Sequence, residues 1–210
     1  MVAVENKKEM SRNIFIVLSA IFIGSLVTCN LIMNKWVAVD LGFKTFNLSA
    51  GVLPYPITFL ITDILSEIYG RRETSKVVLA GFITSLFVLV FLKLGAYFPA
   101  IEISPLANSD YNQVFANTWK VIGSSMVAYL AAQFLDVKLF HFWKTLTKGK
   151  HLWLRNNAST IASQLTDTVL VTTILFIGDK SYSDIFALIK DAWLFKILCA
   201  AFDTPLFYLS

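Results

Sequence analysis

The chain has 210 residues, of which 56% are hydrophobic and 15% are charged, with a formal net charge of +4 and a mean hydropathy of +0.65. A soluble domain carries about 25% charged residues. The low charge therefore excludes a nucleic-acid binder, a disordered chain and an ordinary cytosolic enzyme. Both cysteines, Cys29 and Cys199, lie in apolar runs, which predicts neither a disulfide framework nor a metal site.

Six apolar segments approach the length of about 20 helical residues that crosses a bilayer core of about 30 Å. Because backbone groups in lipid must be satisfied within the segment, we expect each one to be an α-helix. The predicted spans are 14–33, 51–69, 77–98, 121–141, 158–177 and 191–209, with a start at Ile185 as an alternative for the last. The predicted fold is an all-α, polytopic membrane protein with six transmembrane helices, in which residues 1–210 form a single transmembrane domain.

Basic residues are distributed unevenly among the loops between these spans. The loops on one side hold Lys7, Lys8, Arg12, Arg71, Arg72, Lys76, Lys144, Lys148, Lys150 and Arg155, and those on the other hold Lys35, Lys44, Lys120, Lys180 and Lys190. Since the richer side faces the cytoplasm, both termini are predicted to be inside. Lys93, Lys138 and Lys196 lie within spans, where we expect their side chains to snorkel toward the nearer interface.

Carboxylates and amides recur inside spans two, four, five and six. They are Asp63 and Glu67 on span two, Gln133 and Asp136 on span four, Gln164 and Asp167 on span five, and Asp203 on span six. An ionisable group in a bilayer is costly, so each is a hypothesis for a functional site. At 1.5 Å per residue, the carboxylates lie about 5 to 13 Å from the inner boundary, which predicts one layer around a common cavity.

Structural roles remain as alternatives for the shallower carboxylates. These are an ion pair with Arg71 for Glu67, an ion pair with Lys138 or Lys144 for Asp136, and a cap or anchor of the last span for Asp203. Carboxylates accept hydrogen bonds, while amides both accept and donate. A cavity lined by both suits a neutral or cationic ligand that is rich in N–H groups, such as a purine-like base.

Three motifs follow one another along the chain: "GVLPYPITFLITDILSEIYG", "VAYLAAQFLDVKLF" and "GKHLWLRNNASTIASQLTDT", with "CNLIMNKW" at the end of span one. Together they resemble the queuosine precursor transporter family, also known as a vitamin uptake transporter family. The resemblance implies a six-helix, multi-pass protein of the bacterial inner membrane that imports 7-deazaguanine precursors of the modified tRNA base queuosine. Carried over motif by motif, it implies substrate-binding roles for Asn30, Asp63, Glu67, Gln133, Asp136, Arg155, Asn157, Gln164 and Asp167.

The resemblance also implies the partners: a small molecule of the 7-deazaguanine type and membrane lipid, with no nucleic acid, cofactor, catalytic residue or metal. The chain is therefore not expected to be an enzyme. The alternative function is the substrate-binding subunit of an energy-coupling vitamin transporter, which needs a separate ATPase because this chain has no P-loop. The energy source (with proton coupling as one hypothesis), a homodimer and the preferred precursor stay open.

The chain departs from the family after "FDTPLFYL", where it stops, which leaves the role of span six open.

A guanine-like edge presents two adjacent N–H donors, the ring N–H and the exocyclic amine, beside a carbonyl acceptor. We expect Asp63 or Asp167 to accept both donors, because an ionised carboxylate accepts at two oxygens. Gln133 or Gln164 would then donate to the carbonyl.

Overall fold

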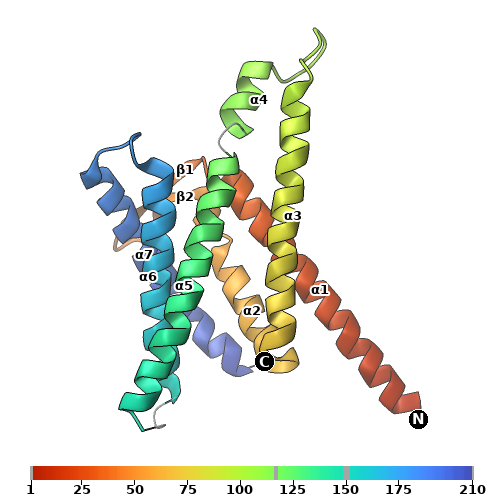
Figure 1. Ribbon diagram of the computed structural model, residues 1–210, viewed down its shortest axis with the longest axis vertical. Coiled ribbons are helices and arrows are strands. Elements are labelled where there is room, and N and C mark those ends of the chain that lie inside the picture. The colour runs from red at the N-terminus through yellow and green to blue at the C-terminus, as the bar shows by residue number, and fades with distance from the viewer. Residues whose placement is uncertain (1, 116–117, 149–151, 210) are drawn as a thin grey trace. The chain divides into compact units, whose positions relative to one another are not determined.

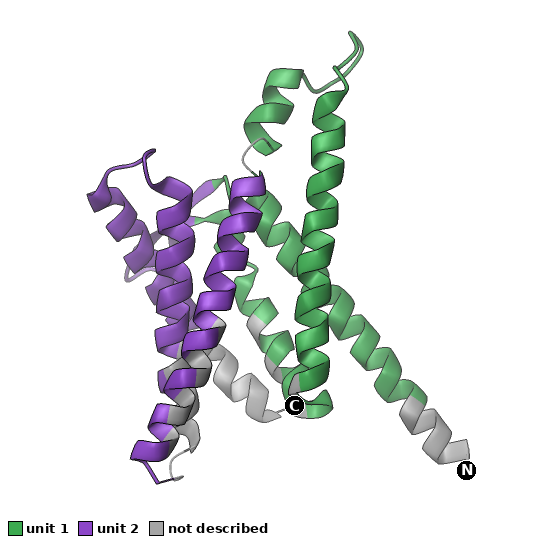
Figure 2. Ribbon diagram, in the orientation of Figure 1, with its two compact units in different colours: residues 1–35, 49–118, 200–210 green, residues 36–48, 119–199 purple. Residues whose placement is uncertain are grey.

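The computed structural model describes residues 2–115, 118–148 and 152–209 (Figure 1). Within its helices, the described part leaves out the side chains of residues 2–8, 59, 63, 67, 71, 133, 136–137, 140–141, 144, 152–157, 159–160 and 200–209. Packing divides the chain into two compact units (Figure 2). Unit 1 comprises residues 1–35, 49–118 and 200–210, and unit 2 comprises residues 36–48 and 119–199. The single transmembrane domain stays a prediction.

Helices form most of both units, and each predicted span coincides with a helix over most of its length. The helices are α1 (Val2–Ile32), α2 (Tyr55–Tyr69), α3 (Arg71–Tyr97), α4 (Asn108–Phe115), α5 (Thr118–Leu146), α6 (Leu152–Phe176) and α7 (Tyr182–Leu209), with a short 3-10 helix, η1, at Ala50–Val52. Among the described residues, Glu9–Ile32 in α1 and Arg72–Tyr97 in α3 are long and apolar enough to cross a membrane. Six crossings with both termini inside stay a prediction.

The side chains of these two apolar stretches point largely outward. Only 17% of the stretch in α1 and 22% of that in α3 are buried. On α3, Ile83, Phe87 and Val90 are each more than half exposed. A helix in the core of a soluble protein would be mostly buried. Exposing the apolar side chains of two such helices to water is unfavourable. Both helices are therefore suited to lipid.

In unit 1, α1 packs against both α2 and α3. The approach to α3 is close at Gly81, where an added Cβ would lie 2.9 Å from the Leu26 side chain. Closer to the start of α1, the Tyr69 hydroxyl at the end of α2 donates to the Ser11 carbonyl at 2.7 Å. Gly70 alone joins α2 to α3, and its φ of +83° favours glycine.

The prolines of span two lie at the start of α2. Pro54 precedes the helix and Pro56 lies in its first turn, where a missing backbone N–H removes no helical hydrogen bond. As a result, α2 begins at Tyr55, later than the span predicted from residue 51. The preceding η1 is fixed by Ser49, whose hydroxyl donates to the Met33 carbonyl at 2.6 Å.

Residues 36–49 form a β-hairpin that the sequence analysis did not predict. Its strands, β1 (Trp36–Asp40) and β2 (Thr45–Ser49), flank a turn in which Gly42 has a φ of +83°. The prediction of an all-α chain is therefore wrong for this segment, and the chain is mostly helical with a two-stranded sheet.

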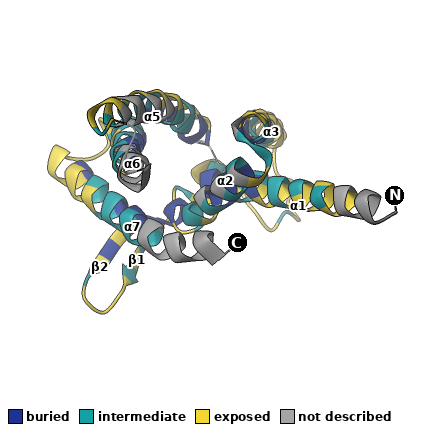
Figure 3. Cartoon of the chain, turned by 90° about the horizontal axis from the view of Figure 1, so that it is seen from below, coloured by how far each residue is buried: buried dark blue, intermediate teal, exposed yellow. Residues whose placement is uncertain are grey.

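The hairpin packs against α7 within unit 2 (Figure 3). Phe46 is fully buried and meets Phe195 edge to face, with ring centroids 6.1 Å apart. On α7, Asp191 accepts hydrogen bonds from Lys44 Nζ at 2.5 Å and from the Asn47 backbone N–H at 3.1 Å. An apolar contact and an ion pair therefore hold the hairpin on one face of α7.

Candidate functional site

A buried ion pair joins α6 and α7 in unit 2. Lys196 Nζ lies 2.9 Å from Asp167 Oδ2 and 3.1 Å from Thr168 Oγ1. Asp167 is 5% exposed and Lys196 is 9% exposed. A charge removed from water is tolerated when an opposite charge and hydrogen bonds compensate it. Each of the two charges therefore depends on the other.

Much of the buried face of α6 is polar. Among the described residues of this helix, Ser163, Asp167, Thr168 and Thr172 are buried together with the apolar Val171 and Leu175. Ile161 and Val169 on the same helix are exposed. The Thr168 hydroxyl donates to the backbone carbonyl of Gln164 at 2.8 Å, so it is satisfied within the helix. A helix with polar groups inside and apolar groups outside fits a membrane protein that encloses a polar site.

Gln164 precedes Asp167 by three residues and Thr168 by four, so the three share one side of α6. The Oε1 atom of Gln164 is buried and has no hydrogen-bond partner among the described residues. Buried acceptors normally find a donor. This oxygen can therefore accept an N–H group from a molecule that binds next to the ion pair.

The predicted snorkelling of Lys196 is wrong, because its side chain is buried and turns toward α6. The sequence contained a signal for this pair. Asp167 and Lys196 lie deep in consecutive spans and carry opposite charges, and charged residues in membrane helices commonly pair with one another. The pattern of spans does not fix which carboxylate a lysine meets, since that depends on how the two helices are rotated.

The structure places two of the nine predicted site residues, Gln164 and Asp167, on one side of α6. Asn30 is buried near the end of α1 in the other unit. The side chains of the other six lie outside the described residues: Asp63 and Glu67 on α2, Gln133 and Asp136 on α5, and Arg155 and Asn157 on α6. The same holds for Asp203 on α7. The common layer and its cavity therefore stay a prediction.

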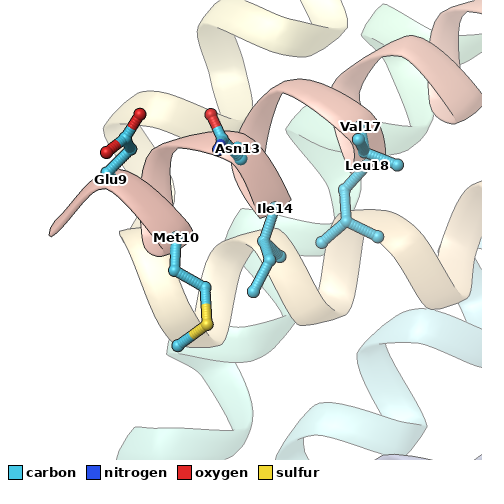
Figure 4. A pocket seen from close by; sticks show the side chains of 6 residues that line it. All are labelled: Glu9, Met10, Asn13, Ile14, Val17 and Leu18. Atoms are coloured by element: carbon cyan, nitrogen blue, oxygen red, sulfur yellow. The ribbon is translucent and has the colours of Figure 1, made fainter. Parts of the chain in front are cut away.

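An open hollow lies elsewhere, along residues 9–18 of α1 (Figure 4). All the residues that line it come from this one helix: Glu9, Met10, Asn13, Ile14, Val17 and Leu18. A surface formed by one side of a single helix does not enclose a ligand as a pocket between elements does. We therefore assign the candidate site to the polar cluster between α6 and α7.

Apolar helices suited to lipid and an ion pair buried between two helices are features of a membrane protein. The chain matches, over residues 49–210, the family model described as "Putative vitamin uptake transporter". The chain therefore belongs to that family, which confirms the resemblance found in the motifs.

Curated relatives carry more specific names. The chain is 33% identical over 162 residues to the "Probable queuosine precursor transporter" of Bacillus subtilis, covering 75% of this chain and 68% of that protein. It is 26% identical over 144 residues to the "Queuosine precursor transporter" of Escherichia coli, covering 68% of this chain and 62% of that protein. Both relatives are named as transporters and not as enzymes, and a transporter of this kind takes a small-molecule substrate. No solved structure is significantly similar to the chain.

Proposed function

We propose that this protein is a multi-pass transporter of the bacterial inner membrane that imports 7-deazaguanine-type precursors of queuosine. The names of its relatives support this substrate class. The observation that carries the proposal is the buried polar cluster of α6, where Asp167 pairs with Lys196 and the Oε1 of Gln164, three residues earlier, has no hydrogen-bond partner in the described part of the chain. Such a cluster offers hydrogen-bond acceptors to the N–H groups of a purine-like base.

The substrate-binding residues in this proposal are those implied by the motifs: Asn30, Asp63, Glu67, Gln133, Asp136, Arg155, Asn157, Gln164 and Asp167. A carboxylate accepts the ring N–H and the exocyclic amine of the base. A site built around such groups discriminates strongly, because an analogue that lacks one of them leaves a buried polar group unpaired. Rejection by a factor of order 10⁴ is the expected scale.

Uptake of labelled 7-deazaguanine by a bacterial strain that cannot synthesise it tests the proposal. We expect Asp63→Ala and Asp167→Asn to abolish uptake, measured per molecule of protein found in the membrane, because removing one partner of a buried ion pair also destabilises the protein. Asp179→Ala is the matched control, because Asp179 pairs with Lys120 at an exposed position. Normal uptake by both Asp63→Ala and Asp167→Asn would overturn the proposal.

The same substrate also separates the two ways of energising uptake. Purified protein in liposomes that contain no other chain should accumulate or equilibrate labelled 7-deazaguanine if it is a self-sufficient transporter. Binding without uptake would instead favour the subunit of an energy-coupling transporter.

A further inference from the structure

An exposed apolar stripe runs along α3 to the end of the helix. Its members recur every three or four residues and therefore share one side of the helix. Since α3 is suited to lipid, this side is where we expect acyl chains to lie. The exposed members of the stripe are Leu79, Ile83, Leu86, Val90, Leu94 and Tyr97.

The stripe continues beyond the helix into the loop of residues 98–107, which joins α3 to α4. Phe98, Ile101 and Ile103 are each more than 60% exposed. The rings of Tyr97 and Phe98 meet edge to face, with centroids 5.4 Å apart. The loop contains no lysine or arginine. Aromatic residues are enriched where a membrane meets water, so the composition of this loop is typical of that boundary.

Hydrogen bonds within the protein satisfy part of the loop backbone. The Ser104 backbone N–H donates to the Ile101 carbonyl at 2.9 Å, and the Ser104 hydroxyl donates to the Leu106 carbonyl at 2.8 Å. The Ala100 backbone N–H donates to Asn108 Oδ1 at 2.8 Å. Backbone groups enter a poorly hydrated layer at low cost only when they are hydrogen-bonded within the protein. The loop is therefore folded in a way that suits contact with lipid.

Helix α4 holds this loop at the end of α3 (Figure 1). The Tyr111 hydroxyl donates to the Leu92 carbonyl at 3.0 Å. The same hydroxyl lies so close to Gly95 that an added Cβ there would be 2.6 Å from it. Both contacts are in the last two turns of α3, so the position of the loop is tied to the helix that it follows.

Two charged side chains limit how deep the loop can lie. Lys93 is exposed about one turn before Tyr97, and Glu102 is exposed between the two isoleucines. A lysine near the end of a span extends its ammonium toward the interface, and a carboxylate is costly in the hydrocarbon core. At 1.5 Å per residue, a core of about 30 Å that begins at Val77 ends near Tyr97. The loop therefore belongs in the headgroup layer.

We propose that residues 97–106 are an interfacial anchor, which inserts into the phospholipid headgroup layer of the leaflet at this end of α3. Its apolar side chains contact the upper part of the acyl chains, while Glu102 stays among the headgroups. The partner is lipid because the anchor continues the lipid-suited stripe of α3 without a break. The anchor fixes how far α3 extends through the bilayer. This inference does not depend on the substrate of the protein.

Fluorescence quenching in phosphatidylcholine vesicles tests the anchor. The full-length protein, with Cys29 and Cys199 replaced by alanine, carries a fluorophore at Ile103→Cys or at the matched control Ser109→Cys. Phospholipids with a nitroxide near the top of the acyl chain quench a label in lipid, and iodide on both sides of the membrane quenches a label in water. We expect nitroxide quenching at position 103 and iodide quenching at position 109, because Ser109 lies in a polar turn where its hydroxyl donates to Asp110.

The protein-to-lipid ratio separates lipid from a second copy of the chain. Nitroxide quenching at position 103 that is independent of this ratio supports the anchor. Protection from iodide that grows with the ratio would show that another copy covers the loop, and the inference would be wrong. Iodide quenching as strong at position 103 as at position 109 would place the loop in water and would also overturn it.

Replacing the isoleucines measures how much they contribute. Ile101→Ser with Ile103→Ser should shift the loop from lipid toward water by about tenfold or more, the ratio expected for losing one buried isoleucine side chain. Iodide quenching of a label at Phe98→Cys should rise accordingly. Both isoleucines are exposed in the folded chain, so the core stays intact. The control is Asn112→Ser with Gln113→Ser, two exposed polar positions of α4. Unchanged quenching in the isoleucine variant overturns the anchor and leaves the proposed transport function standing.

Discussion

Asp167 and Lys196 lie on consecutive helices, and each removes the cost of burying the other. Breaking a buried ion pair at one partner costs about 3 to 5 kcal/mol, because the remaining charge stays buried without compensation. Replacing both partners by neutral groups costs far less. The pair is therefore a structural constraint on α6 and α7 as well as a candidate binding element.

This asymmetry predicts the stabilities of three variants. Lys196→Met alone should lower the free energy of unfolding by about 3 to 5 kcal/mol, and Asp167→Asn alone should have a similar effect. The double variant Asp167→Asn with Lys196→Met should recover most of the loss. Thermal unfolding of the purified variants in detergent measures this. Additive losses in the double variant would show that the two side chains do not interact.

A close backbone approach makes a second residue-scale prediction. An added Cβ at Gly51 would overlap the carbonyl oxygen of Cys29 and lie 3.2 Å from Met33 Cα. Gly51→Ala should therefore destabilise the protein by about 1 to 3 kcal/mol, the usual cost of overpacking. Gly24→Ala is the control, since a Cβ there meets nothing within 4 Å and alanine favours a helix. Equal melting temperatures for the two variants would contradict the prediction.

At the scale of elements, hydropathy predicted the helices well because each long apolar run has one stable form in lipid. It missed the hairpin, although "WVAVD" and "TFNLS" flank Gly42 with partly alternating patterns. Those runs are too short to stand out between longer spans, and their apolar residues are buried by α7, which lies far away in the sequence. Tertiary packing decides such short strands.

The ion pair bears on where the predicted span six starts. In the predicted topology, with 1.5 Å per residue and a core of about 30 Å, Asp167 would lie about 13 Å above the inner boundary. A span that begins at Asp191 would place Lys196 about 9 Å higher than Asp167, whereas one that begins at Ile185 places both at about the same depth. The observed contact of 2.9 Å therefore favours the earlier start.

The docking of the hairpin on α7 makes an element-scale prediction. Truncating a buried phenylalanine costs about 3 to 5 kcal/mol, and Phe46 is 1% exposed. Phe46→Ala should therefore increase amide hydrogen exchange in residues 36–49 by a factor of about 100 or more, because local opening of the hairpin becomes easier. Leu41→Ala at the exposed turn should leave exchange unchanged. Equal protection in both variants would mean that the Phe46 contact does not hold the hairpin.

At the scale of the whole molecule, the sequence predicted membrane character from composition, and the outward apolar faces of α1 and α3 agree with it. The predicted site depended on side chains from several helices, of which the structure places Gln164 and Asp167 on one side of α6 and buries Asn30 near the end of α1. Spacing along one helix fixes which residues share a side, which is why Gln164 and Asp167 were predicted together. Lys196 was not included, because contacts between helices follow from their packing.

Membrane orientation is the prediction that belongs to the whole chain, and α3 offers a direct test. Its stretch Arg72–Tyr97 spans about 39 Å at 1.5 Å per residue, enough to cross a core of about 30 Å. With Cys29 and Cys199 replaced by alanine, a membrane-impermeant thiol reagent applied to intact cells should label Ser109→Cys. It should label Lys76→Cys only after permeabilisation, because the basic residues near the start of α3 are predicted to be inside. Labelling of both positions in intact cells would mean that α3 does not cross the membrane, and the reverse pattern would invert the predicted orientation of the whole chain.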